Sequence, residues 1–135
     1  RISLQSISDG RGRLVVAECN RHVSFPINRM FSISGVPSDE ERGGHAHRKL
    51  NQLLVCLVGR VEVFCDDGNA KRSYVLNDPG TALHVPPGIW AEQSYENEAA
   101  VLVVLCDAPY DELDYLRDYS LFLEYCQSAS ETEEK

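Results

Sequence analysis

The sequence lacks both an excess of positive charge and a long apolar run, and these two absences exclude broad classes of function. Lys and Arg number 13 against 21 Asp and Glu, so the 135-residue chain carries a formal charge of −8. Because nucleic acids and membrane surfaces are anionic and repel such a chain at long range, we expect no nucleic-acid partner and no membrane partner. No stretch approaches the roughly 20 apolar residues of a membrane span, and the N-terminus lacks the apolar core of a secretion signal.

Cysteine is present, but it lacks the spacing of a disulfide or metal framework. The 5 cysteines include no Cys-x-x-Cys pair and are odd in number, which disfavours both a disulfide scaffold and a zinc knuckle. Several lie in apolar runs, as buried free thiols do. We therefore expect a cytoplasmic protein. The chain begins at Arg1 instead of methionine, which suggests a trimmed N-terminus or a part of a larger protein.

Helical periodicity is scarce until the end of the chain, and β-strand patterns dominate. Between residues 14 and 105, short apolar or alternating runs are separated by turn residues, as in a β-sandwich or barrel. Residues 101–105 are apolar throughout, which predicts a strand buried on both faces. The expected strands span residues 14–18, 30–34, 44–47, 52–58, 61–65, 72–76, 82–85, 91–95 and 101–106.

The length and the 43% hydrophobic content fit one domain with a single core. An apolar stripe between Leu113 and Tyr125 predicts a short C-terminal helix that packs on the β-structure. Residues 128–135 are small, polar and acidic, which predicts a disordered tail. We therefore expect one domain over residues 1–127 and an acidic, disordered tail over 128–135.

A pair of histidines is the most informative feature. His45 and His47 stand two positions apart in a predicted strand, so both side chains point to one face. Such a pair can bind a metal, act as general acid and base, or be a polar surface of an amphipathic strand. The chain has only 4 histidines and this pair follows two glycines, which favours a functional role.

The spacing around this pair resembles the first cupin motif, which is His-x-His, four residues, an acceptor side chain, six residues and a glycine. Residues 80–91 resemble the second motif, whose last position is usually a metal-binding histidine. The resemblance implies an all-β, single-domain cupin jelly-roll β-barrel with a short C-terminal helix. Gln52 replaces the usual glutamate, and Ala91 replaces the last histidine. An amide is a poor ligand and a methyl group is none, so we expect no metal and no cofactor.

Nearly the whole chain resembles the nucleotide-sugar 3,4-ketoisomerases, in residues 10–14, 25–29, 42–47, 66–68, 109–112 and 114–119. This resemblance implies an isomerase that moves the keto group of a dTDP-4-keto-6-deoxyhexose from C4 to C3. It also implies a homodimer, often with an exchanged N-terminal strand. Proton transfer through an enediol suits histidine, whose pKa lies near neutrality. One of His45 and His47 would carry the carbon-bound proton and the other would donate to the sugar oxygen.

The diphosphate of a dTDP-linked keto-deoxysugar needs cations, and an acidic chain has few to offer. Arg13, Arg29 and Arg42 are the expected phosphate ligands, because guanidinium groups match phosphate oxygens bidentately. Gln52 and backbone N–H groups would stabilise the enediolate without a metal.

Four further residues are expected at the substrate. Trp90 would stack on the sugar or the base, or else pack in the core. Glu92 lies two residues on and shares its strand face, where it would contact the substrate or else be a solvated carboxylate at the rim. The strand after Arg29 usually carries aromatic residues in the family, and here Ser32 and Ser34 would hydrogen-bond in a larger, wetter pocket.

Two alternatives to the isomerase stay open at this point. Ser32 and Ser34 favour a non-catalytic cupin that binds a nucleotide sugar without converting it. The other alternative is a metal-dependent cupin oxygenase, with His84 or an outside group as a further ligand to the His45 and His47 pair.

Overall fold

The computed structural model describes residues 1–133, which form β-strands, one 3₁₀ turn and one C-terminal helix. The prediction of an all-β domain with a terminal helix is confirmed. In chain order the elements are β1 (Ile2–Ser3), β2 (Gln5–Asp9), β3 (Gly12–Val16), β4 (Arg29–Ser34), β5 (Glu41–His47), β6 (Gln52–Val58), β7 (Val61–Asp66), β8 (Lys71–Leu76), β9 (Thr81–Val85), β10 (Trp90–Tyr95), β11 (Val101–Cys106), the 3₁₀ turn Glu112–Asp114, β12 (Tyr115–Leu116) and α1 (Tyr119–Glu133).

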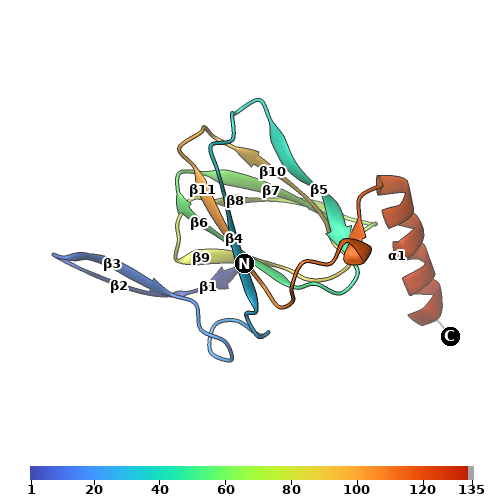
Figure 1. Ribbon diagram of the computed structural model, residues 1–135, viewed down its shortest axis with the longest axis horizontal. Helices are drawn as coiled ribbons and strands as arrows, with labels where there is room; N and C mark the ends of the chain where they lie inside the picture. The colour runs from blue at the N-terminus through green and yellow to red at the C-terminus, as the bar shows by residue number, and fades with distance from the viewer. Residues whose placement is uncertain (134–135) are drawn as a thin grey trace.

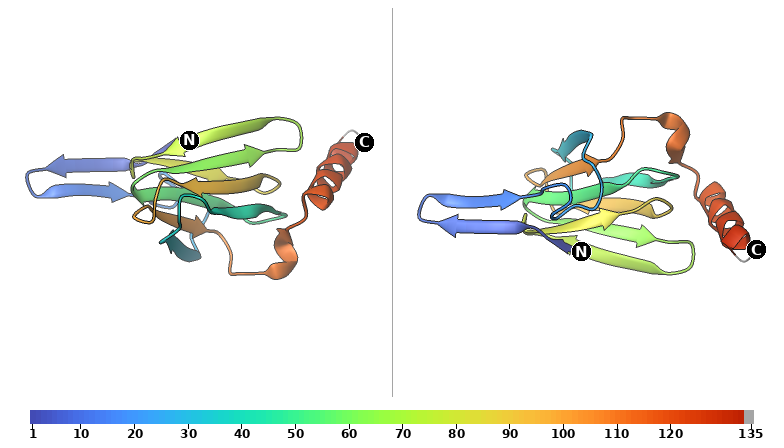
Figure 2. Two further views of the ribbon diagram at one scale, coloured as in Figure 1. Left: turned by 90° about the horizontal axis from the view of Figure 1, so that it is seen from above. Right: turned by 90° about the horizontal axis from the view of Figure 1, so that it is seen from below.

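The strands form two facing sheets, each with 5 strands, in the orders β1-β9-β6-β11-β4 and β12-β5-β10-β7-β8. Every pair of neighbouring strands runs antiparallel. Figure 2 shows the two layers edge on, with α1 beyond one end of them. In the second sheet only the short β12 lies outside β5, which carries the histidine pair.

All nine predicted strands are present, and two of them, β6 and β11, have the predicted bounds. β1, β2 and β12 were not predicted. β2 and β3 form a hairpin that projects away from the barrel, as Figure 1 shows at its left edge. Ile7 and Leu14 on this hairpin are exposed.

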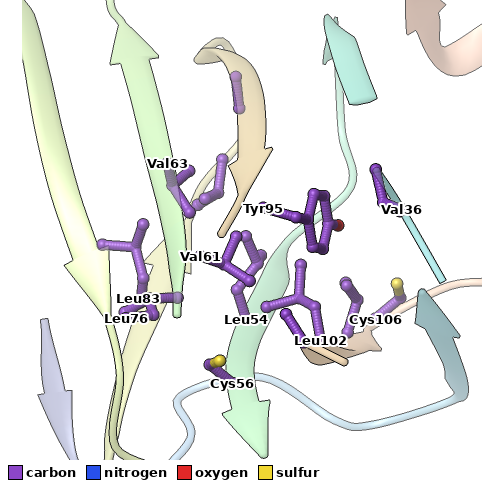
Figure 3. Close-up of a cluster of buried hydrophobic side chains, with 14 of the residues drawn as sticks. Val36, Leu54, Cys56, Val61, Val63, Leu76, Leu83, Tyr95, Leu102 and Cys106 are labelled. Carbon is purple, nitrogen blue, oxygen red and sulfur yellow. The ribbon is translucent and has the colours of Figure 1, made fainter. Parts of the chain in front are cut away.

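The main core fills the space between the sheets, and residues of the strands from β6 to β11 supply most of it (Figure 3). Leu102, Val104 and Cys106 of β11 are buried there. The other face of β11 is only half-buried. The prediction that this strand is buried on both faces is therefore correct for one face only, because the second face is incompletely covered by the N-terminal segment.

The terminal helix packs on the outside of the second sheet. Phe122 is fully buried against Ala46, Trp90 and Leu116. The helix continues to Glu133, so residues 128–133, predicted to be part of a disordered tail, are helical. These residues contain no glycine or proline that would end a helix once packing has formed it. The remainder of the predicted tail, 134–135, lies outside the described residues.

Nowhere in residues 1–133 does a helix combine the length and the apolarity that a membrane crossing requires.

Candidate active site

A glycine bulge in β5 sets the direction of the two histidines. Gly43 and Gly44 have φ values of 87° and 76°, and the register against β10 shifts between His45 and Gly43. A Cβ at Gly43 would lie 2.8 Å from the Ala91 carbonyl oxygen, so only glycine fits. After the bulge His45 stands opposite Ala91, a member of the main core. Opposite residues share a face, so His45 and His47 point into the barrel.

The two imidazoles contact each other and one tyrosine. Their ring centroids are 5.0 Å apart, at an interplanar angle of 80°. The Tyr115 ring lies 5.0 Å from His45 and 4.3 Å from His47. Tyr115 belongs to β12, which pairs with the end of β5. Tyr115 was not predicted at the site, although it lies in a segment that resembles the ketoisomerases.

Tyr115 is carried by a segment that we call the strap, residues 107–118, which follows β11. The strap is tied to the loop after β5, because Arg48 Nη1 donates to the carbonyl oxygens of Leu113, at 2.8 Å, and Tyr115, at 3.0 Å. Arg117 stacks over the Tyr115 ring at 4.1 Å and pairs with Glu112 at 2.7 Å. The strap thus places aromatic and charged groups over the histidine pair.

Burial makes both histidines uncharged at neutral pH. It lowers the pKa of His45 to about 4, with further lowering by the charges of His47 and Arg117. The pKa of His47 is also lowered by burial, against the opposing effect of Asp114. Nδ1 of His45 and both ring nitrogens of His47 are buried without a hydrogen-bond partner among residues 1–133. Buried polar atoms in this state are suited to a bound polar group.

Arg29 brings a cation to the same place. A cavity of about 290 Å³ is lined by Arg29, His47, Asp114 and Tyr115, among others. The guanidinium lies 5.5 Å from the Phe31 ring centroid, and its Nε and Nη2 are buried without a hydrogen-bond partner in the described part of the chain. Phosphate oxygens would satisfy these two donors. Arg29 is therefore the one of the three predicted arginines that lies beside the histidine pair.

Gln52 lies on the opposite sheet. It is buried at the start of β6, opposite the core residue Cys106, whose Sγ is 4.0 Å from Gln52 Nε2. The amide therefore faces the interior of the barrel.

Arg13 and Arg42 lie elsewhere. Arg13 is on the projecting hairpin, where Nη2 is 3.0 Å from Asp78 Oδ2 and Nε is 2.8 Å from Ser6 Oγ. Arg42 is exposed on the other side of the bulge from His45. Burial raises the pKa of the Tyr95 hydroxyl to about 12, and the nearby Arg42 opposes this shift. Within one chain, neither arginine joins Arg29.

The structure corrects the expectation for Ser32 and Ser34. Both are exposed, while Arg29, Phe31 and Ile33 form the half-buried face of β4. Phe31 and Ile33 pack against the main core. Since side chains alternate along a strand, the two serines point to the outside of the barrel and cannot line the cavity.

Trp90 and Glu92 also lie outside the histidine cavity. They flank Ala91, which points inward, so both face the outer surface of the second sheet. Trp90 packs on Tyr119 at 5.3 Å and donates to Glu92 Oε1 at 3.0 Å. Both residues line a separate cavity of about 490 Å³ beneath α1 that contains neither His45 nor His47. The structure therefore supports core packing for Trp90, and it corrects the expectation of a contact with the substrate.

The geometry of a third histidine bears on the metal-dependent alternative. His84 Nε2 lies 2.9 Å from Asn51 Oδ1, and its ring packs on Phe25 at 5.3 Å. His84 stands opposite Leu53, which belongs to the outer cluster under the N-terminal segment, so it does not face the histidine pair. Among residues 1–133, no three His, Cys, Asp or Glu side chains converge on a point that could hold a metal ion.

An antiparallel double-sheet barrel with an inward His-x-His pair on one strand defines a cupin-type protein. The family described as "FdtA: WxcM-like, C-terminal" matches residues 1–127, and the chain belongs to this family.

Three of its relatives are named as 3,4-ketoisomerases or 3,4-oxoisomerases of sugars. The chain is 41% identical over 124 residues to the TDP-4-oxo-6-deoxy-alpha-D-glucose-3,4-oxoisomerase of Aneurinibacillus thermoaerophilus, covering 92% of this chain and 89% of the relative. The sugar 3,4-ketoisomerase QdtA of Thermoanaerobacterium thermosaccharolyticum, solved with TDP, is 34% identical with a TM-score of 0.92, covering 95% and 93% of the two chains. The TDP-quinovose 3,4-ketoisomerase WlaRB of Campylobacter jejuni is 34% identical with a TM-score of 0.87, covering 92% and 96%. The resemblance to the ketoisomerases is confirmed.

Proposed function

We propose that the protein is a sugar-nucleotide 3,4-ketoisomerase that moves the keto group of a dTDP-4-keto-6-deoxyhexose from C4 to C3 without a metal. The observation that carries this proposal is a pair of imidazoles 5.0 Å apart, half-buried at His45 and buried at His47, whose ring nitrogens without hydrogen-bond partners in residues 1–133 lie inside the barrel beside the Arg29 cation. A relative of known reaction, 41% identical over most of both chains, supports the same chemistry.

The reaction needs only proton transfers. One histidine takes the C3 proton, and the electrons of that C–H bond form the C3=C4 double bond of an enediol. The C4 oxygen meanwhile receives a proton from the other histidine. The first histidine then returns its proton to C4, and the second histidine takes the C3 hydroxyl proton in place of the one it donated, so that both histidines are restored and no net oxidation occurs. Uncharged imidazoles suit the abstraction step, because each keeps a lone pair at neutral pH.

Arg29 would hold the diphosphate. Its Nε and Nη2 are buried donors without partners in residues 1–133, at the cavity that also contains His47. Gln52 faces the interior from the opposite sheet, where it could donate to the enediolate oxygen. Arg13 and Arg42 could reach a substrate only if a second chain or the outer part of a nucleotide met them.

The protein would act as a homodimer in the cytoplasm. The β2–β3 hairpin extends from the barrel with Ile7 49% and Leu14 58% exposed, and such apolar groups favour contact with a second copy. The five cysteines are all free, which fits a reducing compartment.

The test is isomerisation and hydrogen exchange of dTDP-4-keto-6-deoxyglucose in D₂O, followed by NMR. We expect a C3-keto product and deuterium at the exchanged carbon. His45→Asn and His47→Asn should each lower the rate at least about 100-fold, the usual contribution of a general acid or base. His84→Asn is the matched control and should keep the rate, because His84 does not face the pair.

Each alternative predicts a different outcome. TDP binding without exchange or product would indicate a binding protein. A first-row metal at one equivalent in protein purified without chelator, with no isomerisation by the wild type, would indicate the oxygenase.

A further inference from the structure

The two histidines of the pair have different surroundings. His47 Nδ1 lies 3.4 Å from Asp114 Oδ2, on the strap. No such carboxylate contact is present for His45 in the described residues, and its strongest charged neighbours are His47 and Arg117. Glu112 on the strap raises the pKa of His45 through its charge, but among the described residues a carboxylate contacts only the His47 imidazole.

Asp114 is held in place by backbone groups. Its Oδ1 accepts the Lys49 N–H at 2.8 Å, and its Oδ2 accepts the Leu50 N–H at 3.2 Å. Its own carbonyl oxygen accepts the Arg48 N–H at 2.9 Å. The side chain is 13% exposed. The carboxylate is thus fixed by the loop that directly follows His47, and its position is coupled to that of the imidazole.

The charges that act on His47 come from two places, the strap, which carries Asp114 and Arg117, and the start of β4, which carries Arg29. Asp114 on the strap favours the protonated ring, whereas Arg29 at the start of β4 and Arg117 after β12 oppose it. His45 on the same strand contacts it edge on. Burial outweighs the carboxylate, so the imidazole is neutral near pH 7.

A neutral imidazole carries its proton on one nitrogen only, and the group facing the other nitrogen decides which. A bare Nδ1 would direct its lone pair at the Asp114 carboxylate, which is repulsive. A protonated Nδ1 directs its N–H there instead. The 3.4 Å separation is long for a hydrogen bond, and such contacts often shorten when substrate binds.

We infer that Asp114 is a positioning residue for His47, which holds the ring in the tautomer protonated at Nδ1 and leaves Nε2 bare for the reacting sugar. This inference assigns a role within the proposed isomerisation and rests on it for its function. The tautomer itself is a property of the free protein.

The decisive measurement is the tautomer of His47 in protein labelled with ¹⁵N-histidine, read from long-range ¹H–¹⁵N correlations near pH 7.5. His47→Asn identifies the signals by their absence. We expect Nδ1 to be of the protonated type and Nε2 of the bare type. A wild-type His47 protonated at Nε2 overturns the inference, and no variant is needed for that result.

Asp114→Asn tests the cause. Since Oδ1 makes the shorter backbone bond, the new amide nitrogen takes the place of Oδ2, donates to Nδ1 and shifts the tautomer toward Nε2–H. Asp67→Asn is the matched control, because Asp67 Oδ1 also accepts two successive backbone N–H groups, of Asn69 and Ala70, away from the site. A folded Asp114→Asn variant that keeps the wild-type tautomer overturns the inference.

Kinetic measurements distinguish a positioning role of Asp114 from a purely structural one. In Asp114→Asn we expect kcat to fall by about 10- to 100-fold, with KM changed by no more than about 3-fold, because the orientation of the imidazole is lost and not the site. The acid limb of the pH profile should move to lower pH, since Asp114 raises the pKa of His47. An equal loss in Asp67→Asn would show a structural effect and refute the role. If the wild type does not isomerise the sugar, the proposed function fails while the tautomer measurement still decides the contact.

Discussion

Replacing Arg29 by methionine removes the cation beside His47 and should weaken nucleotide binding far more than it weakens the fold. Arg29 Nε and Nη2 have no hydrogen-bond partner in residues 1–133, so a phosphate would supply their first partners. A hydrogen bond to a charged group contributes about 1.5–3 kcal/mol. Loss of one such contact raises the Kd for TDP by about 10- to 100-fold.

The fold should tolerate the same change. Methionine keeps an unbranched apolar side chain against Phe31, and removal of an unpaired, partly buried charge costs little or is favourable. The guanidinium also lies 5.9 Å from the Tyr110 ring centroid, and loss of the two cation–π contacts costs about 0.5–1 kcal/mol each, so the free energy of unfolding should change by no more than about 2 kcal/mol. The pKa of His47 should rise, because the charge of Arg29 lowers it in the wild type.

Isothermal titration calorimetry with TDP, thermal denaturation and a histidine NMR titration measure these three effects. Arg21→Met is the matched control, because it removes one positive charge from a surface pair with Glu18 at 3.9 Å, both side chains being 58% exposed. If Arg29→Met binds TDP as tightly as Arg21→Met does, Arg29 is not a phosphate ligand. If Arg29→Met unfolds, Arg29 stabilises the fold and its role is structural.

Two further predictions concern pH and assembly. The pKa of His45 is about 4 in the folded protein and about 6.5 in the unfolded chain. Between these two pH values the unfolded chain binds more protons than the folded protein. The free energy of unfolding should therefore rise with pH up to about 6.5 and then level off. The urea midpoint, measured between about pH 5 and 7, should rise with pH more steeply in the wild type than in His45→Asn. Equal slopes in the two proteins would contradict the burial of His45. Leu14→Asp on the hairpin should be monomeric by light scattering and keep an intact barrel by circular dichroism. The control Leu121→Asp, at a similarly exposed leucine of α1, should stay dimeric. A dimeric Leu14→Asp variant would exclude the hairpin from the interface.

The strands were predictable where a run of residues is apolar or alternates and is bounded by turn residues. β6 and β11 consist almost entirely of apolar residues and were predicted with their correct bounds. β1 and β12 each contain only 2 residues, too few for any period, and exist because a neighbouring strand pairs with them. β2 is a polar strand whose only partner is β3 in the projecting hairpin. Such strands depend on tertiary pairing more than on their own residues.

The errors in the predicted site arose because the sequence does not show which alternate residues of a strand face the interior of the barrel. A strand that reads Arg-Met-Phe-Ser-Ile-Ser can turn either set of alternate residues inward, and a shift of one residue exchanges the two faces. In the structure Arg29 belongs to the inward face, because its guanidinium lies beside Phe31 and lines the cavity with His47. With Arg29, Phe31 and Ile33 inside, Ser32 must lie outside. In β10, Ala91 faces inward opposite His45, so Trp90 is left under α1.

The His-x-His motif was enough to predict where the reactive groups lie, but not their pKa values or their tautomers. Two adjacent residues of the strap, Asp114 and Tyr115, lie against His47, and the sequence places them more than sixty residues from it. The same His-x-His pair on a barrel without the strap would be open to water on that side, with a pKa closer to the ordinary value and no carboxylate to select a tautomer. The strap must be in place before the pair can act, so variants that loosen it, such as those of Arg48, should impair catalysis without altering either histidine.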